Sequence, residues 1–426
     1  MHFAPISPAS LLVTDIGCLA VVPQGPLRGG AMRNIPLERD AAVWIDNGRI
    51  AWLGPRRDAP TPARTVALSA DGGLAIPGLI DPHTHIPFAG QRAAEFVRRI
   101  AGESYLSIMQ AGGGIRATMH AVRAATVEQL VYENLPRLMR MLAFGVTTVE
   151  CKSGYGLSRE SERDQLLAMR ALARLSPIDV APTYLGAHAL PPEYDGRADA
   201  FIDAISDAAL LREFAREKLA RFCDVFCDVG AFDVAQTRRV FERATAAGLK
   251  LKIHADELGQ IGATRLAGEC GAVSADHLEH TDDAGIDALR AAGTIPVVLP
   301  GTSFFLGIGH APARRLIDAG LPVALGTDFN PGSCMIDSLP LIMNIACCQL
   351  RMLPLEVLAA CTANAAAAID EHTRIGSLAP GFDGDLVVLD AASLDDWMYT
   401  PGRSRTRYVI KRGRIVYAHG SGREAD

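Results

Sequence analysis

Eight short apolar segments alternate with helical intervals through the middle of the chain, and this rhythm restricts the possible folds more than any other feature. Intervals such as 162–175 and 235–248 carry apolar residues at the spacing of one helix face. Eight β/α repeats predict a closed parallel (β/α)8 barrel, the TIM barrel, with its active site at the carboxyl ends of the strands. The eight expected strands cover residues 74–81, 146–154, 180–188, 222–228, 249–257, 272–280, 294–301 and 322–332.

The two ends of the chain follow a different pattern, in which β-rich runs flank turns that contain glycine. Residues 43–54 and 408–420 each predict a hairpin. Asn47-Gly48 suits a type I′ turn, in which both central residues have positive φ, and the Arg-Gly of the second hairpin is a weaker signal of the same kind. Neither end has enough strands to close a core alone, so we expect one small β-sandwich domain built from both termini.

This division predicts three stretches along the chain. Residues 1–75 and 376–426 would form the two parts of the β-sandwich domain, and residues 76–375 would form the catalytic barrel. The connection over residues 86–145, between the first two barrel strands, is far longer than one crossover helix requires. We therefore expect this connection to contribute to the active site.

Composition and charge exclude several classes of protein. Hydrophobic residues make up 49% of the chain and charged residues 21%, as in soluble globular proteins, and a formal charge of −6 without a long basic cluster argues against nucleic-acid binding. The first residues lack the charged leader of a signal peptide, and no apolar run approaches the roughly 18 residues needed to span a membrane. Nine scattered cysteines show no disulfide framework, which favours a cytoplasmic enzyme.

The apolar run IPGLIDPHTH ends in two histidines, His83 and His85, separated by one residue. Side chains two apart on a strand point to the same face, so both imidazoles can reach one metal ion. In isolation, such a pair is at least as often two ordinary hydrogen-bonded histidines. His254 and Asp328, which end the fifth and eighth strands, favour the metal, because four ligands would then converge at the barrel mouth and leave one position for water.

Two further groups are expected beside that water. His277 ends the sixth strand and could bind or polarise the attacked group, although a hydrogen-bonded core histidine is the alternative. Glu257 lies three residues beyond His254, outside the expected metal ligands, and general acid/base catalysis is its best role. The neighbouring Asp256 and His280 project differently from their strand ends, so structural or solvated roles are expected for both.

The sequence resembles the amidohydrolase superfamily in three features. These are the stretch IPGLIDPHTH, a histidine after each of strands five and six, and GTD after strand eight. Within that superfamily it resembles the imidazolonepropionase family over almost its full length. The stretches that carry this second resemblance are PHTHIPFAGQRAAEF, AGESYLSIMQAGGGI, ECKSGYGL, YLGAHALPPEY, HADELGQIGA, SADHLEHT, LPGTSFFLG and GTDFNPGS.

The resemblance implies substrate-binding roles for residues outside the expected metal site. Arg92 matches the family's carboxylate-binding arginine, whose guanidinium offers two fixed hydrogen bonds. Tyr105 is a further candidate for the carboxylate pocket, and Tyr155 and His188 match a substrate-binding pair. Packing or surface roles are the alternative for each. The loop that would hold substrate or product comprises Asn330, Gly332 and Ser333.

The sequence departs from its binuclear relatives at strand four. Those relatives bridge two metals with a carboxylated lysine there, but FCDVFCD contains no lysine, so one metal per subunit is expected. Either Zn²⁺ or Fe³⁺ is compatible with three histidines and one aspartate. The family would have glutamate after the cysteine of this strand, and the effect of Asp228 at that position is open. Lys152 lies on strand two, where a structural or ion-pair role is expected.

The reaction that the resemblance implies is hydrolysis of the ring amide of 4-imidazolone-5-propanoate to N-formimidoyl-L-glutamate, in L-histidine degradation. Asp328 and His277 would orient or deprotonate the attacking water, and Glu257 would pass a proton to the ring nitrogen; the division of work among these three is open. The family also implies a homodimer. An aminohydrolase such as guanine or cytosine deaminase is the rival, which Arg92 disfavours because those substrates carry no carboxylate. A barrel without chemistry is the second rival, which the intact candidate ligands disfavour.

Overall fold

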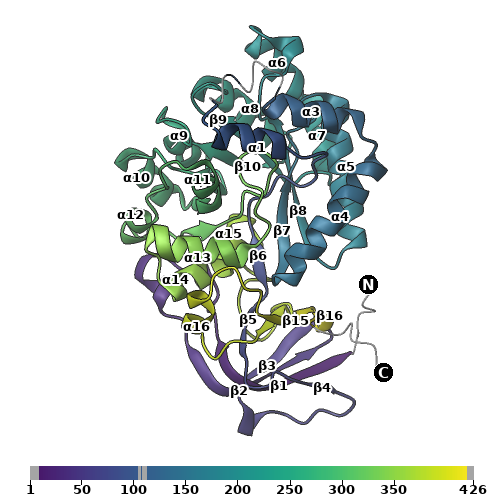
Figure 1. Ribbon diagram of the computed structural model, residues 1–426, viewed down its shortest axis with the longest axis vertical. Helices are drawn as coiled ribbons and strands as arrows, with labels where there is room; N and C mark the ends of the chain where they lie inside the picture. Colours follow the sequence, from purple (N-terminus) through teal and green to yellow (C-terminus); the bar gives the residue numbers. More distant parts are fainter. Residues whose placement is uncertain (1–8, 104–106, 108–112, 420–426) are drawn as a thin grey trace.

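Two eight-stranded sheets organise the computed structural model, which describes residues 9–103, 107 and 113–419 (Figure 1). One sheet is the barrel, and the other, drawn below it in purple and yellow, combines strands from the two ends of the chain. No helix in these ranges is long and apolar enough to cross a membrane.

The barrel consists of eight parallel strands in sequence order. The ladder runs from β6 to β13, and a bridge between Thr84 and Phe329, just beyond those two strands, joins its ends. The amide of Asp328 donates to the carbonyl of His83 at 3.0 Å across the same junction. The expected TIM barrel is therefore confirmed. Its strands are β6 (Leu79–Asp81), β7 (Val146–Lys152), β8 (Asp179–Ala187), β9 (Phe222–Cys227), β10 (Lys250–Ala255), β11 (Ser274–His277), β12 (Ile295–Val298) and β13 (Ala324–Leu325).

Helices surround the barrel, and several of them begin at a polar side-chain cap. The two helices expected from spacing correspond to α5, whose N-cap Ser158 accepts from the Ser161 amide, and α8, which starts with a capping box of Asp233 and Gln236. The helices are α1 (Ala93–Ile100), α3 (Ile115–Ala124), α4 (Val127–Ala143), α5 (Arg159–Leu175), α6 (Ala198–Ile205), α7 (Ala208–Arg216), α8 (Val234–Ala246), α9 (Ala263–Glu269), α10 (Asp283–Ala292), α11 (Pro300–Leu306), α12 (Ala313–Asp318), α13 (Leu339–Leu350), α14 (Pro354–Ala360), α15 (Ala363–Ala368) and α16 (Leu394–Tyr399), with short 3-10 turns η1 (Gly29–Arg33), η2 (Arg56–Asp58) and η3 (Pro192–Tyr194).

The second sheet interleaves strands from both termini. Its order is β16-β15-β14-β5-β1-β2-β3, with β4 pairing β1, so the C-terminal strand β14 lies beside the N-terminal strand β5. Both expected hairpins form, and their turn residues Asn47, Gly48, Arg412 and Gly413 all have positive φ. The strands are β1 (Ser10–Ala20), β2 (Leu37–Asp46), β3 (Arg49–Pro55), β4 (Val66–Ser69), β5 (Leu74–Pro77), β14 (Leu386–Leu389), β15 (Thr406–Lys411) and β16 (Arg414–Ala418).

The expectation of one barrel strand over residues 74–81 was wrong, because the chain changes sheets in the middle of this run. β5 pairs with β14 and β1 in the terminal sheet, whereas β6 pairs with β7 in the barrel. Gly78 lies at the crossing, where a Cβ atom would come within 2.4 Å of the Thr147 hydroxyl. Both halves are fully buried, so the apolar pattern of the run does not reveal the break.

Candidate active site

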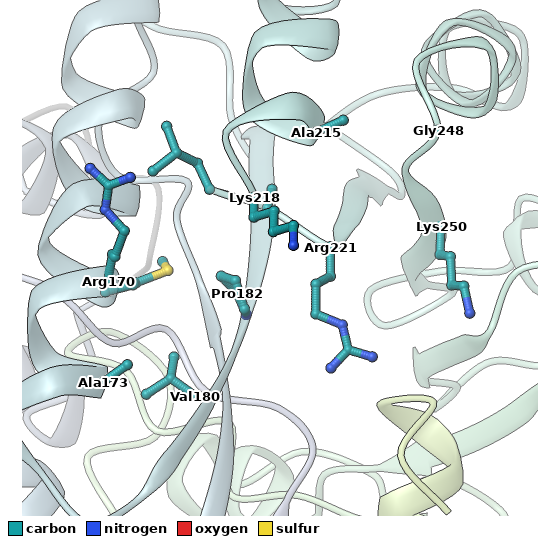
Figure 2. Close-up of a pocket in the computed structure, with 12 residues that line it drawn as sticks. Arg170, Ala173, Val180, Pro182, Ala215, Lys218, Arg221, Gly248 and Lys250 are labelled. Carbon is teal, nitrogen blue, oxygen red and sulfur yellow. The ribbon is translucent and has the colours of Figure 1, made fainter.

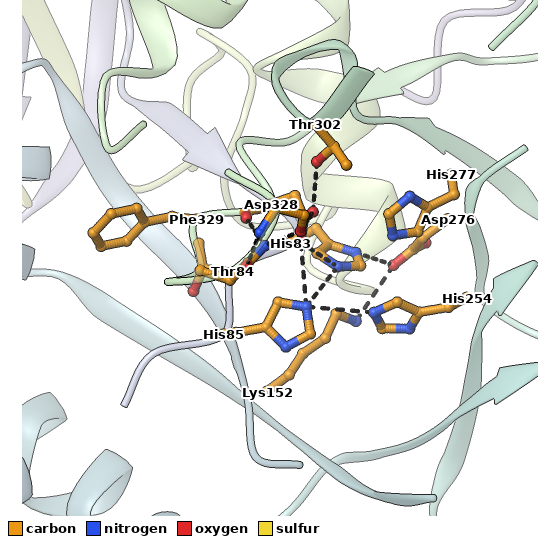
Figure 3. Close-up of polar contacts among 12 residues, drawn as sticks. His83, Thr84, His85, Lys152, His254, Asp276, His277, Thr302, Asp328 and Phe329 are labelled. Carbon is orange, nitrogen blue, oxygen red and sulfur yellow. Dashed lines mark hydrogen bonds and ion pairs between the residues drawn. The ribbon is translucent and has the colours of Figure 1, made fainter. Parts of the chain in front are cut away.

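Four electron-rich donor atoms converge at the carboxyl ends of the barrel strands (Figure 3). Nε2 of His85 lies 3.4 Å from Nε2 of His83, 3.4 Å from Nε2 of His254 and 3.2 Å from Oδ1 of Asp328, and His83 Nε2 lies 3.4 Å from the same Oδ1. Ligands held about 2.0 to 2.1 Å from one metal in tetrahedral geometry are about 3.3 Å apart. The four distances match that edge, so these side chains suit a single ion.

In His83 and His254, a carboxylate holds the Nδ1 atom of the ring, and this leaves Nε2 facing the other donor atoms. Nδ1 of His83 lies 2.6 Å from Oδ2 of Asp276, and Nδ1 of His254 lies 3.1 Å from Oδ1 of Asp224. A histidine whose Nδ1 proton is held by a carboxylate presents the Nε2 lone pair, which is the usual arrangement of a metal ligand. Oδ1 of Asp328 is buried with no hydrogen-bond partner among the described atoms, and a cation would satisfy it.

Burial and neighbouring carboxylates determine the protonation of the three histidines. It lowers the pKa of His85 and of His254, which favours the neutral imidazole that binds metals. It also opposes the charged form of His83, but the carboxylates of Asp276 and Asp328 more than offset this effect and raise its pKa to about 9. Binding of a cation at His83 would therefore displace a proton.

Asp328 is held by hydroxyl groups on its far oxygen. Oδ2 accepts from Thr302 Oγ1 at 2.5 Å and from Ser333 Oγ at 3.3 Å, which leaves Oδ1 directed toward the histidines. Burial disfavours the charged carboxylate, but the nearby imidazoles of His83 and His85 more than offset this effect and hold the pKa of Asp328 well below its usual value. Asp328 is therefore an anion at neutral pH.

His277 and Glu257 lie next to the four-donor cluster. The His277 ring centroid is 5.2 Å from that of His254, and its Nε2 is 3.6 Å from Oε2 of Glu257. His277 is one of a set of three possible ligands with His83 and His254, so its position allows either metal binding or contact with the attacked group. Burial raises the pKa of Glu257 to about 7, which suits a group that gives and takes a proton near neutral pH.

Two acidic residues that the sequence analysis did not assign support this pair. The Asp228 carboxylate accepts backbone hydrogen bonds from Glu257 at 2.5 Å, Leu258 at 2.9 Å and Gly259 at 3.1 Å, so it fixes the turn that carries Glu257. No sequence signal showed this, since the donors lie some thirty residues away. Glu279 lies 3.8 Å from Nδ1 of His277, and burial raises its pKa to about 8. Its place two residues after His277 was a signal that could have been used.

The expected structural role of Asp256 fits its contacts, since the carboxylate accepts backbone hydrogen bonds from Ile261, Ala263 and Thr264 at the start of α9. His280 is exposed.

Tyr155 and His188 form an aromatic wall against the histidine cluster. The His188 ring stacks on His85 with centroids 5.0 Å apart, and the Tyr155 ring lies 5.4 Å from His188 and 5.8 Å from His85. Burial lowers the pKa of His188 to about 3, and its Nδ1 is 2.9 Å from the Gly154 carbonyl. His188 is therefore a neutral ring that donates at Nδ1 and presents Nε2 as an acceptor.

The loop after β13 is held by its own hydrogen bonds. Oδ1 of Asn330 accepts from the amides of Gly332 and Ser333, both at 2.8 Å, and its Nδ2 donates to the Asp328 carbonyl at 2.7 Å. A Cβ atom on Gly332 would lie 2.4 Å from Nη1 of Arg92, so only glycine allows the guanidinium to approach. The loop thus connects Asp328 to Arg92.

Arg92 begins α1 and already has a carboxylate partner. Its Nε and Nη2 lie 2.9 and 2.7 Å from Oε2 of Glu95, which also accepts the Gly114 amide at 3.1 Å. Both residues line a cavity of about 240 Å³ together with Arg99 and Gly332. The (i, i+3) spacing of Arg92 and Glu95 is a sequence signal for this pair that the analysis did not use. Tyr105, the other expected carboxylate contact, lies outside the described residues.

A second cavity, of about 540 Å³, lies at the opposite end of the barrel (Figure 2). It borders the amino ends of β8, β9 and β10, and its rim carries Arg170, Lys218, Arg221 and Lys250. Two of these cations are paired, Arg221 with Glu371 and Lys250 with Asp370. None of the predicted site residues lines this cavity, so we place the chemistry at the histidine cluster.

Comparisons with known proteins agree with this architecture. The amidohydrolase family model matches residues 97–417. Imidazolonepropionase from Symbiobacterium thermophilum is 44% identical over 97% of this chain and 98% of its own length, and that from Chloroflexus aggregans is 47% identical over 96% and 97%. Among solved structures, Escherichia coli guanine deaminase superposes with a TM-score of 0.74 at 16% identity over 97% of this chain and all of its own. A zinc-bound adenosine deaminase from Xanthomonas campestris gives 0.70 at 22% identity, covering 96% and 93%. At these identities, the two structures show the fold alone.

Proposed function

The chain belongs to the imidazolonepropionase family of the amidohydrolases, and from this premise we propose how its residues carry out the family's reaction. The enzyme is a metal-dependent hydrolase of a cyclic carbon–nitrogen bond. It converts 4-imidazolone-5-propanoate to N-formimidoyl-L-glutamate in L-histidine degradation. The observation that carries the proposal is the convergence of three imidazole nitrogens and one carboxylate oxygen beside a buried glutamate.

We assign one Zn²⁺ or Fe³⁺ ion per subunit to His83, His85, His254 and Asp328. When bound, such an ion lowers the pKa of water and polarises a carbonyl oxygen. The donor set supports one ion, because the four donor distances of 3.2 to 3.4 Å are close to a tetrahedral edge and strand four contains no lysine that could bridge two metals. Elemental analysis of protein purified without added metal should give about one ion per chain, and two tightly bound ions would contradict this assignment.

The remaining chemistry is assigned to Asp328, His277 and Glu257. Asp328 and His277 orient the attacking water or accept its proton, and His277 stabilises the oxyanion that develops on the ring carbonyl. Glu257 hydrogen-bonds the ring nitrogen and supplies the proton with which that nitrogen leaves. Its raised pKa and its position 3.6 Å from His277 support this proton transfer.

Substrate recognition is assigned to residues beside the histidine cluster and at the start of α1. The Arg92 guanidinium binds the propionate, with Tyr105 as a further contact, and Tyr155 and His188 contact the ring. The close approach of Arg92 to Gly332 supports a shared pocket. The loop that completes it comprises Asn330, Gly332 and Ser333.

A turnover assay on the purified native enzyme tests this function. Hydrolysis of 4-imidazolone-5-propanoate, followed by loss of the ring chromophore, should proceed with kcat/KM in the range of ordinary enzymes, about 10⁴ M⁻¹s⁻¹ or more. Guanine and cytosine should react far more slowly, because neither supplies a carboxylate for Arg92. Faster release of ammonia from either base would instead make the enzyme a deaminase.

Assembly and location are also proposals. The free state of all nine cysteines supports a reducing, cytoplasmic compartment. A formal charge of −6 supports a small-molecule partner rather than nucleic acid. We propose a homodimer by analogy with the family, and light scattering coupled to size exclusion would measure its mass, with a monomer as the contradicting result.

A further inference from the structure

Five charged side chains lie inside the barrel, directly beneath the histidine cluster, and none of them has a role in the proposed reaction. All are fully buried, with no exposed surface. Figure 3 shows two of them, Lys152 and Asp276, with the ammonium group of Lys152 directed at the Asp276 carboxylate. The five are Glu150, Lys152, Asp224, Lys252 and Asp276.

Lys152 connects the two carboxylates that hold the imidazoles of His83 and His254. Its Nζ lies 2.7 Å from Oδ2 of Asp224 and 3.3 Å from Oδ2 of Asp276. The other oxygen of Asp224 accepts from His254 Nδ1, and the same Oδ2 of Asp276 accepts from His83 Nδ1. One ammonium group therefore fixes, through two aspartates, the rings of two candidate metal ligands from different strands.

Burying five charged groups costs desolvation free energy, which argues that the cluster has a function beyond stability. Replacing a buried set of charges by apolar side chains of similar volume is often neutral or stabilising, so stability alone does not account for five of them. Partners that fix the tautomer and ring orientation of a metal-binding histidine do account for them, because such partners typically contribute 10- to 100-fold in metal affinity.

We propose that Lys152 is a positioning residue that sets the metal affinity of the site by holding Asp224 and Asp276 in the orientations that point His254 and His83 at one ion. The proposal rests on the metal centre assigned above. Lys152 itself occupies the space among His83, Glu150 and Asp276, a set of donors that could otherwise hold a cation.

Lys252 provides a matched control within the same cluster. It is equally buried and carries the same charge, but it contacts Glu150 at 2.6 Å and the Pro82 carbonyl at 3.2 Å. Among the residues that the structure describes, neither aspartate lies within ion-pair distance of Lys252. Lys152→Met and Lys252→Met therefore remove one buried charge each, but only the first removes ion pairs with the two aspartates that hold the imidazoles.

The experiment measures metal binding rather than turnover. Each variant and the native protein are stripped with a chelator and titrated with Co²⁺ in competition with a chromophoric chelator, and the visible spectrum of the bound Co²⁺ reports the ligand geometry. We expect Lys152→Met to weaken Co²⁺ binding about 10- to 100-fold and to change the spectrum, and Lys252→Met to stay within a few-fold with the native spectrum. Equal losses in both variants would overturn the proposal, because the cluster would then only support the core.

Two further variants make the metal-binding experiment decisive. If Lys152→Met does not fold, as judged by circular dichroism, Asp276→Asn replaces it, with the same expected loss of affinity and the same overturning result if affinity is unchanged. Combining Lys152→Met with Asp276→Asn should cost little more than either change alone, because the two act through one connection. Native protein that binds no Co²⁺ would refute the assigned metal centre, whereas native binding that Lys152→Met leaves intact would refute this inference alone.

Discussion

The proposed metal site at the histidine cluster and the proposed carboxylate site at Arg92 are built in different ways. On the metal side, His83, His254 and Asp328 are at most 2% exposed, and each has its second polar atom held by a carboxylate or a hydroxyl group. On the carboxylate side, Arg92 begins α1, a helix with no buried residue, and its guanidinium is held by Glu95 one turn along the same helix.

This difference reflects what each side must do. Ligands and proton donors have to be placed to a fraction of an ångström, and barrel strands cross-linked by buried hydrogen bonds provide that accuracy. A carboxylate can be bound by a side chain that adjusts to it, so the proposed recognition residue Arg92 can lie on the long connection after β6. We therefore expect changes on the metal side to affect chemistry and changes on the α1 side to affect specificity.

The largest effect is expected from His254→Ala. It removes one of the proposed ligands of the ion, so metal and activity should both be lost while the circular dichroism spectrum is kept, because His254 is not part of the apolar core that packs the strands and helices of the barrel. His280→Ala is the control, since His280 is exposed and lies beyond the neighbouring strand. Full metal content and turnover in His254→Ala would show that His254 is not a ligand.

Glu257→Gln should have the next largest effect. The variant keeps the shape of the pocket and the metal but loses a group whose pKa lies near 7, so kcat should fall about 10²- to 10⁴-fold at unchanged metal content. Glu279→Gln is the comparison, because burial also raises the pKa of this neighbour of His277. A larger loss in Glu279→Gln would move the proton transfer to Glu279.

The sequence predicted which strand ends meet better than it predicted contacts between distant segments, for a physical reason. A parallel barrel brings the ends of its strands to one rim, so His83, His254 and Asp328 could be placed together from their positions alone. The split at Gly78 and the cap that Asp228 provides for the Glu257 turn depend on contacts between distant segments, which no local pattern contains. The ligand assignment itself stays a prediction until metal is measured.

Arg92→Ala tests the proposed carboxylate site. Loss of a hydrogen-bonded charge pair with the propionate should weaken transition-state binding by about 1.5 to 3 kcal/mol, which lowers kcat/KM about 10- to 10²-fold. The metal content should not change. Arg92→Lys should recover only part, because an ammonium cannot form the two-pronged contact. Arg98→Ala, which removes a cation of α1 that pairs with Glu103, is the control.

A ring substrate without the carboxylate separates recognition from support. It should react poorly with the native enzyme and lose little more in Arg92→Ala. Equal losses on both substrates would show that Arg92 maintains the catalytic centre, and the contrast between the two proposed sites would then fail.

The smallest effect is expected from Glu95→Gln. This change tests most directly whether the Arg92 side chain can adjust to the substrate carboxylate. Glu95 now occupies Nε and Nη2 of Arg92, so the substrate carboxylate must displace it or bind at Nη1 beside Gly332. Glutamine keeps the size of the side chain but removes the competing charge, and KM should therefore fall a few-fold while kcat and metal content stay unchanged. Competitive inhibition by glutarate should tighten by the same factor, since glutarate offers the carboxylate without the ring. A rise in KM would mean that Glu95 orients Arg92 rather than competes with the substrate, and the α1 side would then be as firmly preorganised as the metal side.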